Sequence, residues 1–129
     1  MNEFERGQWS RIRQWLEADG FTDNNWFDGE DAPMLPGVYV IVVPWYGVVY
    51  VGQSKSLAGR LTARHEVLTA LRSRGYAIVG RFFKTVPADQ LDAAERALIR
   101  EFQPMFNRLG RDFSIRFSSL ACEIGVSHE

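Results

Sequence analysis

The sequence predicts one α+β domain in which helices flank a small, mainly antiparallel sheet of three strands. Three observations lead to this class. The chain has 129 residues, which is the usual length of a single domain. Its hydrophobic pattern changes along the chain between strand and helix periods. Two β-branched runs are joined by a short segment containing Pro and Gly, which is typical of a hairpin.

The N-terminal part is expected to be a helix followed by an irregular loop. Trp9, Ile12 and Leu16 recur at helical spacing within residues 3–19, and Gly20 is a typical helix stop. The following residues, up to Pro36, are rich in Asp, Asn and Gly, so we expect no regular structure there.

The hairpin is predicted from two runs, GVYVIVV (37–43) and VVYVGQ (48–53). Their continuous apolar character indicates strands that are covered on both faces. The hydrophobic period then changes from that of a strand to that of a helix, and one helix is expected from Ser56 to the region of Gly75. Its apolar face would consist of Leu57, Leu61, Leu68 and Leu71.

A third strand is predicted over residues 76–86, and a second core helix begins after Pro87 and ends at Pro104. In the C-terminal tail, apolar residues alternate with polar ones over residues 113–117, which predicts a short edge strand. The chain therefore divides into an N-terminal extension (1–36), a core module (37–108) and a C-terminal extension (109–129).

Composition sets the class of protein. The charged residues are 15 Lys and Arg against 16 Asp and Glu, and 46% of residues are hydrophobic, as in ordinary globular proteins. The single cysteine, Cys122, excludes a disulfide framework. The N-terminus lacks a signal-peptide pattern, and the longest apolar run, residues 38–44, is far shorter than the ~20 residues that span a bilayer. We expect a cytoplasmic protein with no membrane contact.

The charges are segregated along the chain. Residues 1–53 hold three basic and eight acidic side chains, whereas residues 54–116 hold twelve basic and six acidic ones. The core module is therefore basic, as a surface that binds phosphates should be. The acidic stretch from Asp19 to Asp31 is either a solvated loop or a segment that competes with nucleic acid near the site.

Three charged residues lie on or beside apolar helix faces. Glu95 falls inside the apolar stripe of the second core helix, where a carboxylate is costly unless it is paired or binds a metal. Arg60 and Arg64 lie on or beside the leucine face of the preceding helix, where an anion would compensate them. A rim position that reaches water is the alternative for all three.

The two runs of the predicted hairpin each contain a tyrosine, and together they carry a motif that is similar to that of a known nuclease family. Gly37-Val38-Tyr39 and, after ten residues, Tyr50-Val51-Gly52 resemble the GIY-YIG motif, with Val in place of both isoleucines. The resemblance extends over residues 37–107 with the family's order of further residues, which here are Arg60, Glu95, Pro104 and Asn107.

This resemblance implies a GIY-YIG-like fold and a metal-dependent endonuclease that hydrolyses phosphodiester bonds in DNA with one Mg²⁺ or Mn²⁺ ion. RNA stays open as a substrate. By resemblance, Glu95 is the metal ligand, Tyr39 the general base or water-positioning phenol, and Arg60 the group that binds the scissile phosphate. Tyr50 would orient the water or the phosphate. The supporting residues would be Gly52, Arg64, His65 and Asn107, and the nucleic-acid-binding ones Lys55, Arg60, Arg64 and Arg108.

One departure concerns a histidine. Many members of the family carry His four residues after the Arg, a position that is Arg64 here, and His65 follows. In one continuous helix His65 would point about 140° away from Arg60. Either Arg64 substitutes for the histidine, or the helix starts in another register, or the site lacks this group.

Two other functions compete with the nuclease. A catalytically inactive nucleic-acid-binding module would explain the Arg64 departure. A partner-binding protein would use the aromatic N-terminal extension, with Trp9, Trp15, Trp26 and Phe27. The sequence shows no helix-turn-helix, zinc finger or basic arm after the module, so a stand-alone member is expected.

Overall fold

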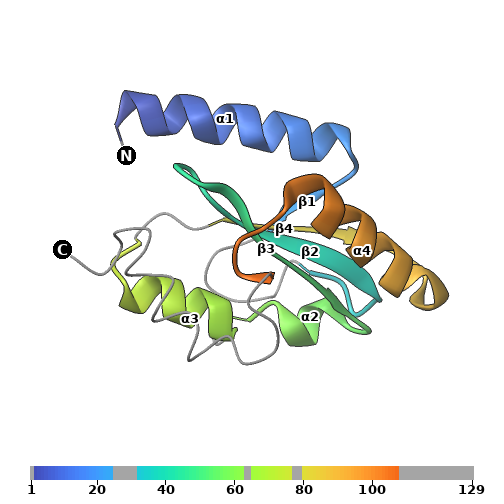
Figure 1. The fold of residues 1–129 in the computed structure, drawn as a ribbon. Helices are drawn as coiled ribbons and strands as arrows, with labels where there is room; N and C mark the ends of the chain where they lie inside the picture. Colours follow the sequence, from blue (N-terminus) through green and yellow to red (C-terminus); the bar gives the residue numbers. More distant parts are fainter. Residues whose placement is uncertain (1, 25–31, 63–64, 77–79, 108–129) are drawn as a thin grey trace.

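The structure is a computed structural model that describes residues 2–24, 32–62, 65–76 and 80–107. Figure 1 shows helices above and below a central sheet. The elements in chain order are α1 (Glu3–Ala18), β1 (Thr22–Asn24), β2 (Gly37–Val43), β3 (Gly47–Ser54), α2 (Leu57–Arg60), α3 (Glu66–Ser73), β4 (Gly80–Thr85), a 3₁₀ turn (Ala88–Gln90) and α4 (Leu91–Phe102).

The sheet has four strands in the order β1-β4-β2-β3, and every neighbouring pair is antiparallel. The prediction of three strands was therefore wrong by one. The additional strand, β1, pairs Thr22 with Phe83 and Asn24 with Arg81. Its sequence, TDN, has no apolar alternation, so only its pairing with β4 makes it a strand. The hairpin of β2 and β3 forms as predicted.

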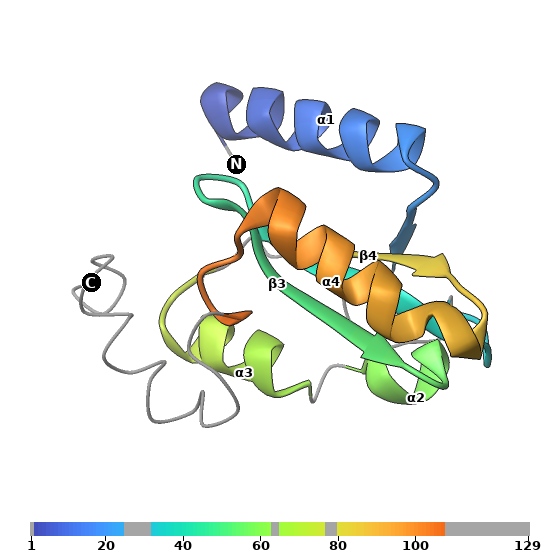
Figure 2. The ribbon, with the colours of Figure 1, turned by 45° about the vertical axis from the view of Figure 1, so that its right-hand side comes forward.

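Each face of the sheet is covered by a different pair of helices (Figure 1, Figure 2). On one face, α1 and α4 enclose a core that includes Trp9, Val40 and Leu98. On the other face, α2 and α3 pack over Tyr39. They do so through the leucines that the sequence analysis placed on one helical face. Strand β2 lies between both layers and is buried at all seven positions, as its apolar run predicted.

Helix α1 is capped at its N-terminus and packs on the core through Trp9 and Leu16. Asn2 forms a capping box with Glu5, which satisfies amide groups at the N-terminus of the helix. Trp9 packs so closely on Gly80 that a side chain at residue 80 would overlap the indole ring. After the helix, Gly20 adopts φ +91°, the left-handed conformation expected of a helix stop. The N-terminal helix is therefore part of the packed fold.

The single helix predicted from Ser56 to Gly75 is wrong, because the chain forms two helices, α2 and α3, with a break between them. A continuous helix would pair the Leu61 carbonyl with the His65 amide. Instead, the buried Arg81 donates from Nη1 to the Leu61 carbonyl (3.1 Å), and the His65 amide bonds to Thr62 (3.1 Å). His65 then caps α3. The helical angles calculated for residues beyond Leu61 consequently do not hold.

The last helix agrees with the prediction. A 3₁₀ turn follows Pro87, α4 runs to Phe102, and Gln103 ends it with φ +48° just before Pro104. The edge strand predicted over residues 113–117 lies outside the described residues, as do Trp26 and Phe27. Within the described ranges, no helix is long and apolar enough to cross a bilayer.

Candidate active site

Tyr39 lies at the centre of the candidate site, on the sheet face that α2 and α3 cover. Residues 39 and 52 are paired across β2 and β3, and a Cβ on Gly52 would overlap the phenol ring of Tyr39. Tyr50 comes from the same strand as Gly52, and its ring centroid is 6.2 Å from that of Tyr39. Gly52 therefore makes the space in which the Tyr39 phenol lies.

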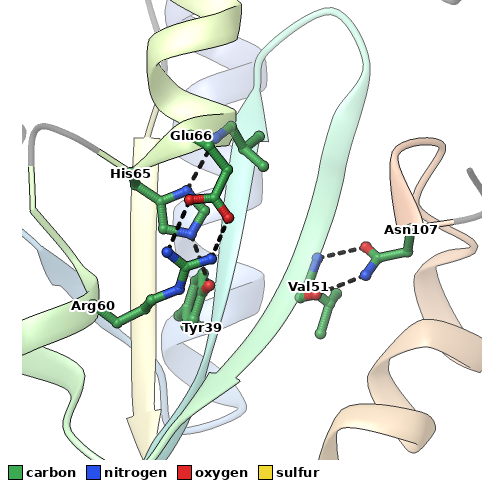
Figure 3. Close-up of polar contacts among 7 residues, drawn as sticks. Tyr39, Val51, Arg60, His65, Glu66 and Asn107 are labelled. Carbon is green, nitrogen blue, oxygen red and sulfur yellow. Dashed lines mark hydrogen bonds and ion pairs between the residues drawn. The ribbon is translucent and has the colours of Figure 1, made fainter. Parts of the chain in front are cut away.

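His65 contacts the Tyr39 hydroxyl. The His65 Nε2 atom is 2.7 Å from Tyr39 Oη, and His65 Nδ1 accepts a hydrogen bond from the Val67 amide at 3.1 Å (Figure 3). Burial lowers the pKa of His65 to about 4, with a further contribution from the charge of Arg60, so the imidazole is neutral at pH 7. Because Nδ1 is an acceptor, the single proton is on Nε2 and is donated to Tyr39.

Arg60, the last residue of α2, forms an ion pair with Glu66, the first residue of α3 (Figure 3). Arg60 Nη1 donates to Glu66 Oε2 at 2.9 Å, and Nη2 donates to Oε1. The hydrogen bond from Arg60 holds the pKa of Glu66 at about 2. The break between α2 and α3 allows this pairing of two helix ends.

Burial raises the pKa of the Tyr39 hydroxyl well above its usual value, and the nearby Tyr50 adds to this shift. The charge and hydrogen bond of Arg60 oppose it. Burial also raises the pKa of Tyr50; Arg60 lowers it, whereas Glu66 and Glu95 raise it. Tyr50 is therefore within electrostatic range of both the Arg60 pair and Glu95.

Glu95 lies in the second turn of α4, half-buried beside β3. Gln53 Nε2 donates to Glu95 Oε1 at 2.9 Å and to Asp92 Oδ1 at 2.8 Å. The carboxylate that the sequence placed on an apolar stripe is thus held by a neutral amide. Among the described residues, no Lys or Arg forms an ion pair with it.

One or two carboxylates, those of Glu95 and its neighbour Asp92, could bind a metal ion here. The described residues contain no group of three His, Cys, Asp or Glu that could surround an ion. This donor set suits Mg²⁺, which keeps several waters and uses one or two protein carboxylates. It does not suit a structural zinc ion, which needs four protein ligands.

Asn107 binds the backbone of the edge strand β3. Its Oδ1 accepts from the Val51 amide and its Nδ2 donates to the Val51 carbonyl, both at 2.7 Å (Figure 3). The Phe106 amide also donates to the Val49 carbonyl at 3.1 Å. The side-chain amide thus pairs with β3 as a peptide group of another strand would.

The structure brings Tyr39, Tyr50, Gly52, Arg60 and His65 together on one face. Glu95 lies on α4, which packs against β3, and its contact in the site is with Gln53. Lys55 is exposed just after β3, whereas Arg64 and Arg108 lie outside the described residues. Three residues that take part in the hydrogen bonds of the site were not found by the sequence analysis: Gln53, Glu66 and Asp92. The only available signal was spacing, since Asp92 and Glu95 are three residues apart on one helix.

The chain resembles the GIY-YIG superfamily. It carries the family's motif residues in order, and its sequence is similar to that of one particular protein, UvrABC system protein C, in several bacteria. The identity is 39% over 85 residues with the protein of Mycobacteroides abscessus and 38% over 87 residues with that of Beutenbergia cavernae. These matches cover 62% and 64% of this chain but only 13% of each relative.

The chain therefore spans about an eighth of the length of these curated relatives. No protein-family profile matches the chain. Among solved structures, a similar one is the GIY-YIG N-terminal endonuclease domain of UvrC from Thermotoga maritima bound to its catalytic divalent cation, magnesium. Its identity is 23% and its TM-score 0.44, with 57% of this chain and 84% of that chain covered.

Proposed function

We propose that this protein is a metal-dependent endonuclease that hydrolyses phosphodiester bonds in DNA. The observation that carries the proposal is the contact of 2.7 Å between Tyr39 Oη and His65 Nε2, with the guanidinium of Arg60 beside them (Figure 3). Similarity to UvrABC system protein C supports the same class of activity. The basic charge of residues 54–116 supports a polyanionic substrate.

Arg60 binds the scissile phosphate in this proposal. Its guanidinium is planar, permanently charged and partly exposed, and its two Nη atoms can each donate to one non-bridging phosphate oxygen. Negative charge on those oxygens increases towards the transition state, so donors fixed beside them lower the barrier. Lys55, Arg64 and Arg108 would bind neighbouring phosphates of the strand.

Tyr39 positions the attacking water. Because its pKa is raised, the phenol is protonated at neutral pH in this state, which favours orientation of water over direct removal of a proton. His65 Nε2–H fixes the position of the Tyr39 oxygen and would stabilise a phenolate if the proton left. Tyr50, within range of both Arg60 and Glu95, would orient the water or the phosphate.

Glu95 is the metal ligand in this proposal, and Gln53 holds one of its oxygens in place. When bound, one Mg²⁺ or Mn²⁺ ion would supply Lewis-acid stabilisation of the phosphoryl and leaving oxygens. Asp92 is close enough to the same amide to share this role. Asn107 supports the site by fixing the backbone of β3 between Tyr50 and Gly52.

A cleavage panel tests the proposal. Supercoiled plasmid, branched, flapped and single-stranded DNA, with a matched RNA strand, are incubated with Mg²⁺ or Mn²⁺. The wild type should nick or cut at least one DNA substrate, and Glu95→Ala should remove this activity. Glu101→Ala is the matched control, because Glu101 is an exposed carboxylate on the same helix with no bond to the site.

Failure to cleave any substrate with either metal would exclude the nuclease. If DNA binding persisted in both the wild type and Glu95→Ala without cleavage, the chain would be a nucleic-acid-binding module on this fold. Cleavage of RNA alone would replace DNA as the substrate.

A further inference from the structure

The guanidinium of Arg60 already has an anion bound to it. Both Nη atoms donate to Glu66, and each bonds to a different carboxylate oxygen. This two-pronged geometry is the one in which a guanidinium binds two oxygens of a phosphate group. Glu66 therefore occupies the outer, Nη1–Nη2 edge of Arg60, which is one of the edges at which a phosphodiester can bind.

The two ligands exclude each other, because a carboxylate and a phosphate cannot accept from the same N–H groups in the same plane. Both bring negative charge, so they also repel each other. Binding of a phosphate at the outer edge of Arg60 consequently requires Glu66 to leave or to turn away.

The ion pair is placed where such an exchange can occur. The Arg60 side chain is 34% exposed and that of Glu66 47%. Glu66 is in the first turn of α3, so its side chain can turn into water without moving the helix. Exposed ion pairs are weak, which makes their replacement by a solute feasible.

We propose that Glu66 is an internal competitor for the nucleic-acid phosphate at Arg60, so that substrate binds by replacing a carboxylate of the protein itself. This inference rests on the proposed function for the role of Arg60. It assigns to Glu66 a role opposite to that of a positioning residue. A positioning carboxylate would improve phosphate binding by Arg60, whereas a competitor weakens it.

The test measures DNA binding without catalysis. The affinity of a short fluorescein-labelled duplex is determined by anisotropy in EDTA for the wild type, Glu66→Gln, Arg60→Ala and the double variant. Glu66→Gln should bind about 2- to 5-fold more tightly than the wild type, as expected for the loss of an exposed ion pair. In the Arg60→Ala background, Glu66→Gln should cause no such gain.

The matched control is Glu3→Gln. Glu3 is also an exposed glutamate in the first turn of a helix, α1, so this change removes the same charge far from the site. It should alter the affinity by less than about twofold. Circular dichroism melts verify that all variants fold.

The inference is overturned if Glu66→Gln binds as weakly as the wild type or more weakly. It is also overturned if the gain persists without Arg60, or if Glu3→Gln gives an equal gain, because the effect would then be one of total charge. These outcomes do not depend on cleavage. Absence of cleavage in the metal panel would contradict the proposed function while leaving a gain that depends on Arg60 intact.

Discussion

Tyr39 and Gly52 share one space in the hairpin of β2 and β3. They are paired across the strands, and the phenol ring of Tyr39 fills the volume in which any other residue at 52 would carry its Cβ. The glycine of the second half of the motif is thus required by the tyrosine of the first half.

Gly52→Ala should therefore displace the Tyr39 ring. We expect a loss of about 1–3 kcal/mol in the free energy of unfolding, as for overpacking of a core, together with a fall in cleavage rate. Denaturant titration and the cleavage assay measure the two effects. Gly7→Ala in α1, where a Cβ meets nothing closer than 3.8 Å, is the control and should not destabilise the protein. An unchanged cleavage rate in Gly52→Ala would show that the ring position is unimportant.

The Tyr39 hydroxyl should contribute to rate much more than to stability. Tyr39→Phe keeps the ring and its packing but removes the oxygen that His65 contacts. We expect the cleavage rate to fall by about 10²-fold or more, and the free energy of unfolding to fall by about 1 kcal/mol. Single-turnover cleavage and denaturant titration separate the two. Equal activity in Tyr39→Phe would remove Tyr39 from the proposed chemistry.

Burial of His65 should make the protein acid-sensitive. Its pKa is about 4 in the folded protein against 6.5 as the ordinary value, so the unfolded chain binds this proton first. Stability is then complete above pH 6.5 and decreases as the pH falls towards 4, by about 3 kcal/mol at most. Urea titrations at pH 7.0, 5.5 and 4.5 measure the decrease.

The matched variant for this pH dependence is His65→Asn, which removes the titrating group while keeping a polar side chain. Its overall stability will be lower, but its loss between pH 7.0 and 4.5 should be smaller than that of the wild type. A parallel pH dependence in both proteins would show that other groups cause the acid sensitivity. Glu66, with a pKa of about 2, loses its contribution only below about pH 4.5.

Metal binding should depend on Glu95. A ligand that binds only the folded state raises the melting temperature, so Mg²⁺ or Mn²⁺ should stabilise the wild type in a concentration-dependent way. Glu95→Ala should abolish this shift, whereas Glu101→Ala should preserve it. Thermal melts with increasing metal, followed by EDTA, provide the measurement. Retention of the shift in Glu95→Ala would move the ion to another site.

Replacement of Asn107 by Asp, the residue closest to it in shape, should lower the stability of the protein. Asn107→Ala loses two hydrogen bonds to Val51, and we expect a cost of about 1–3 kcal/mol. Asn107→Asp keeps the acceptor for the Val51 amide but places a second oxygen against the Val51 carbonyl. It should therefore be at least as harmful as alanine at neutral pH. Denaturant titration compares them, and a benign Asn107→Asp would contradict this reading of the contact.

The sequence predicted those parts of the fold that follow from local patterns. Apolar periods located α1, the hairpin and α4, and Gly20 marked the end of α1. The break after α2 was missed because the group that ends this helix is Arg81, which is 20 residues further along the chain. Strand β1 was missed because its three residues are polar and depend on pairing with β4.

The same limit applies to the candidate site. The motif resemblance named Tyr39, Arg60 and Glu95, whose order along the chain carries the signal. Their partners Glu66 and Gln53 could not be named, because hydrogen bonds between separate elements depend on how the helices pack on the sheet. Because the helix is broken, His65 does not point in the direction calculated for one continuous helix and lies against Tyr39 instead.

The contact between Asn107 and Val51 also affects how copies of the chain meet each other. Strand β3 ends the sheet, and an open edge of this kind is a template on which a strand of another molecule can add. By occupying the peptide groups of Val51, Asn107 closes the middle of that edge. Loss of this amide would therefore promote self-association in concentrated solution.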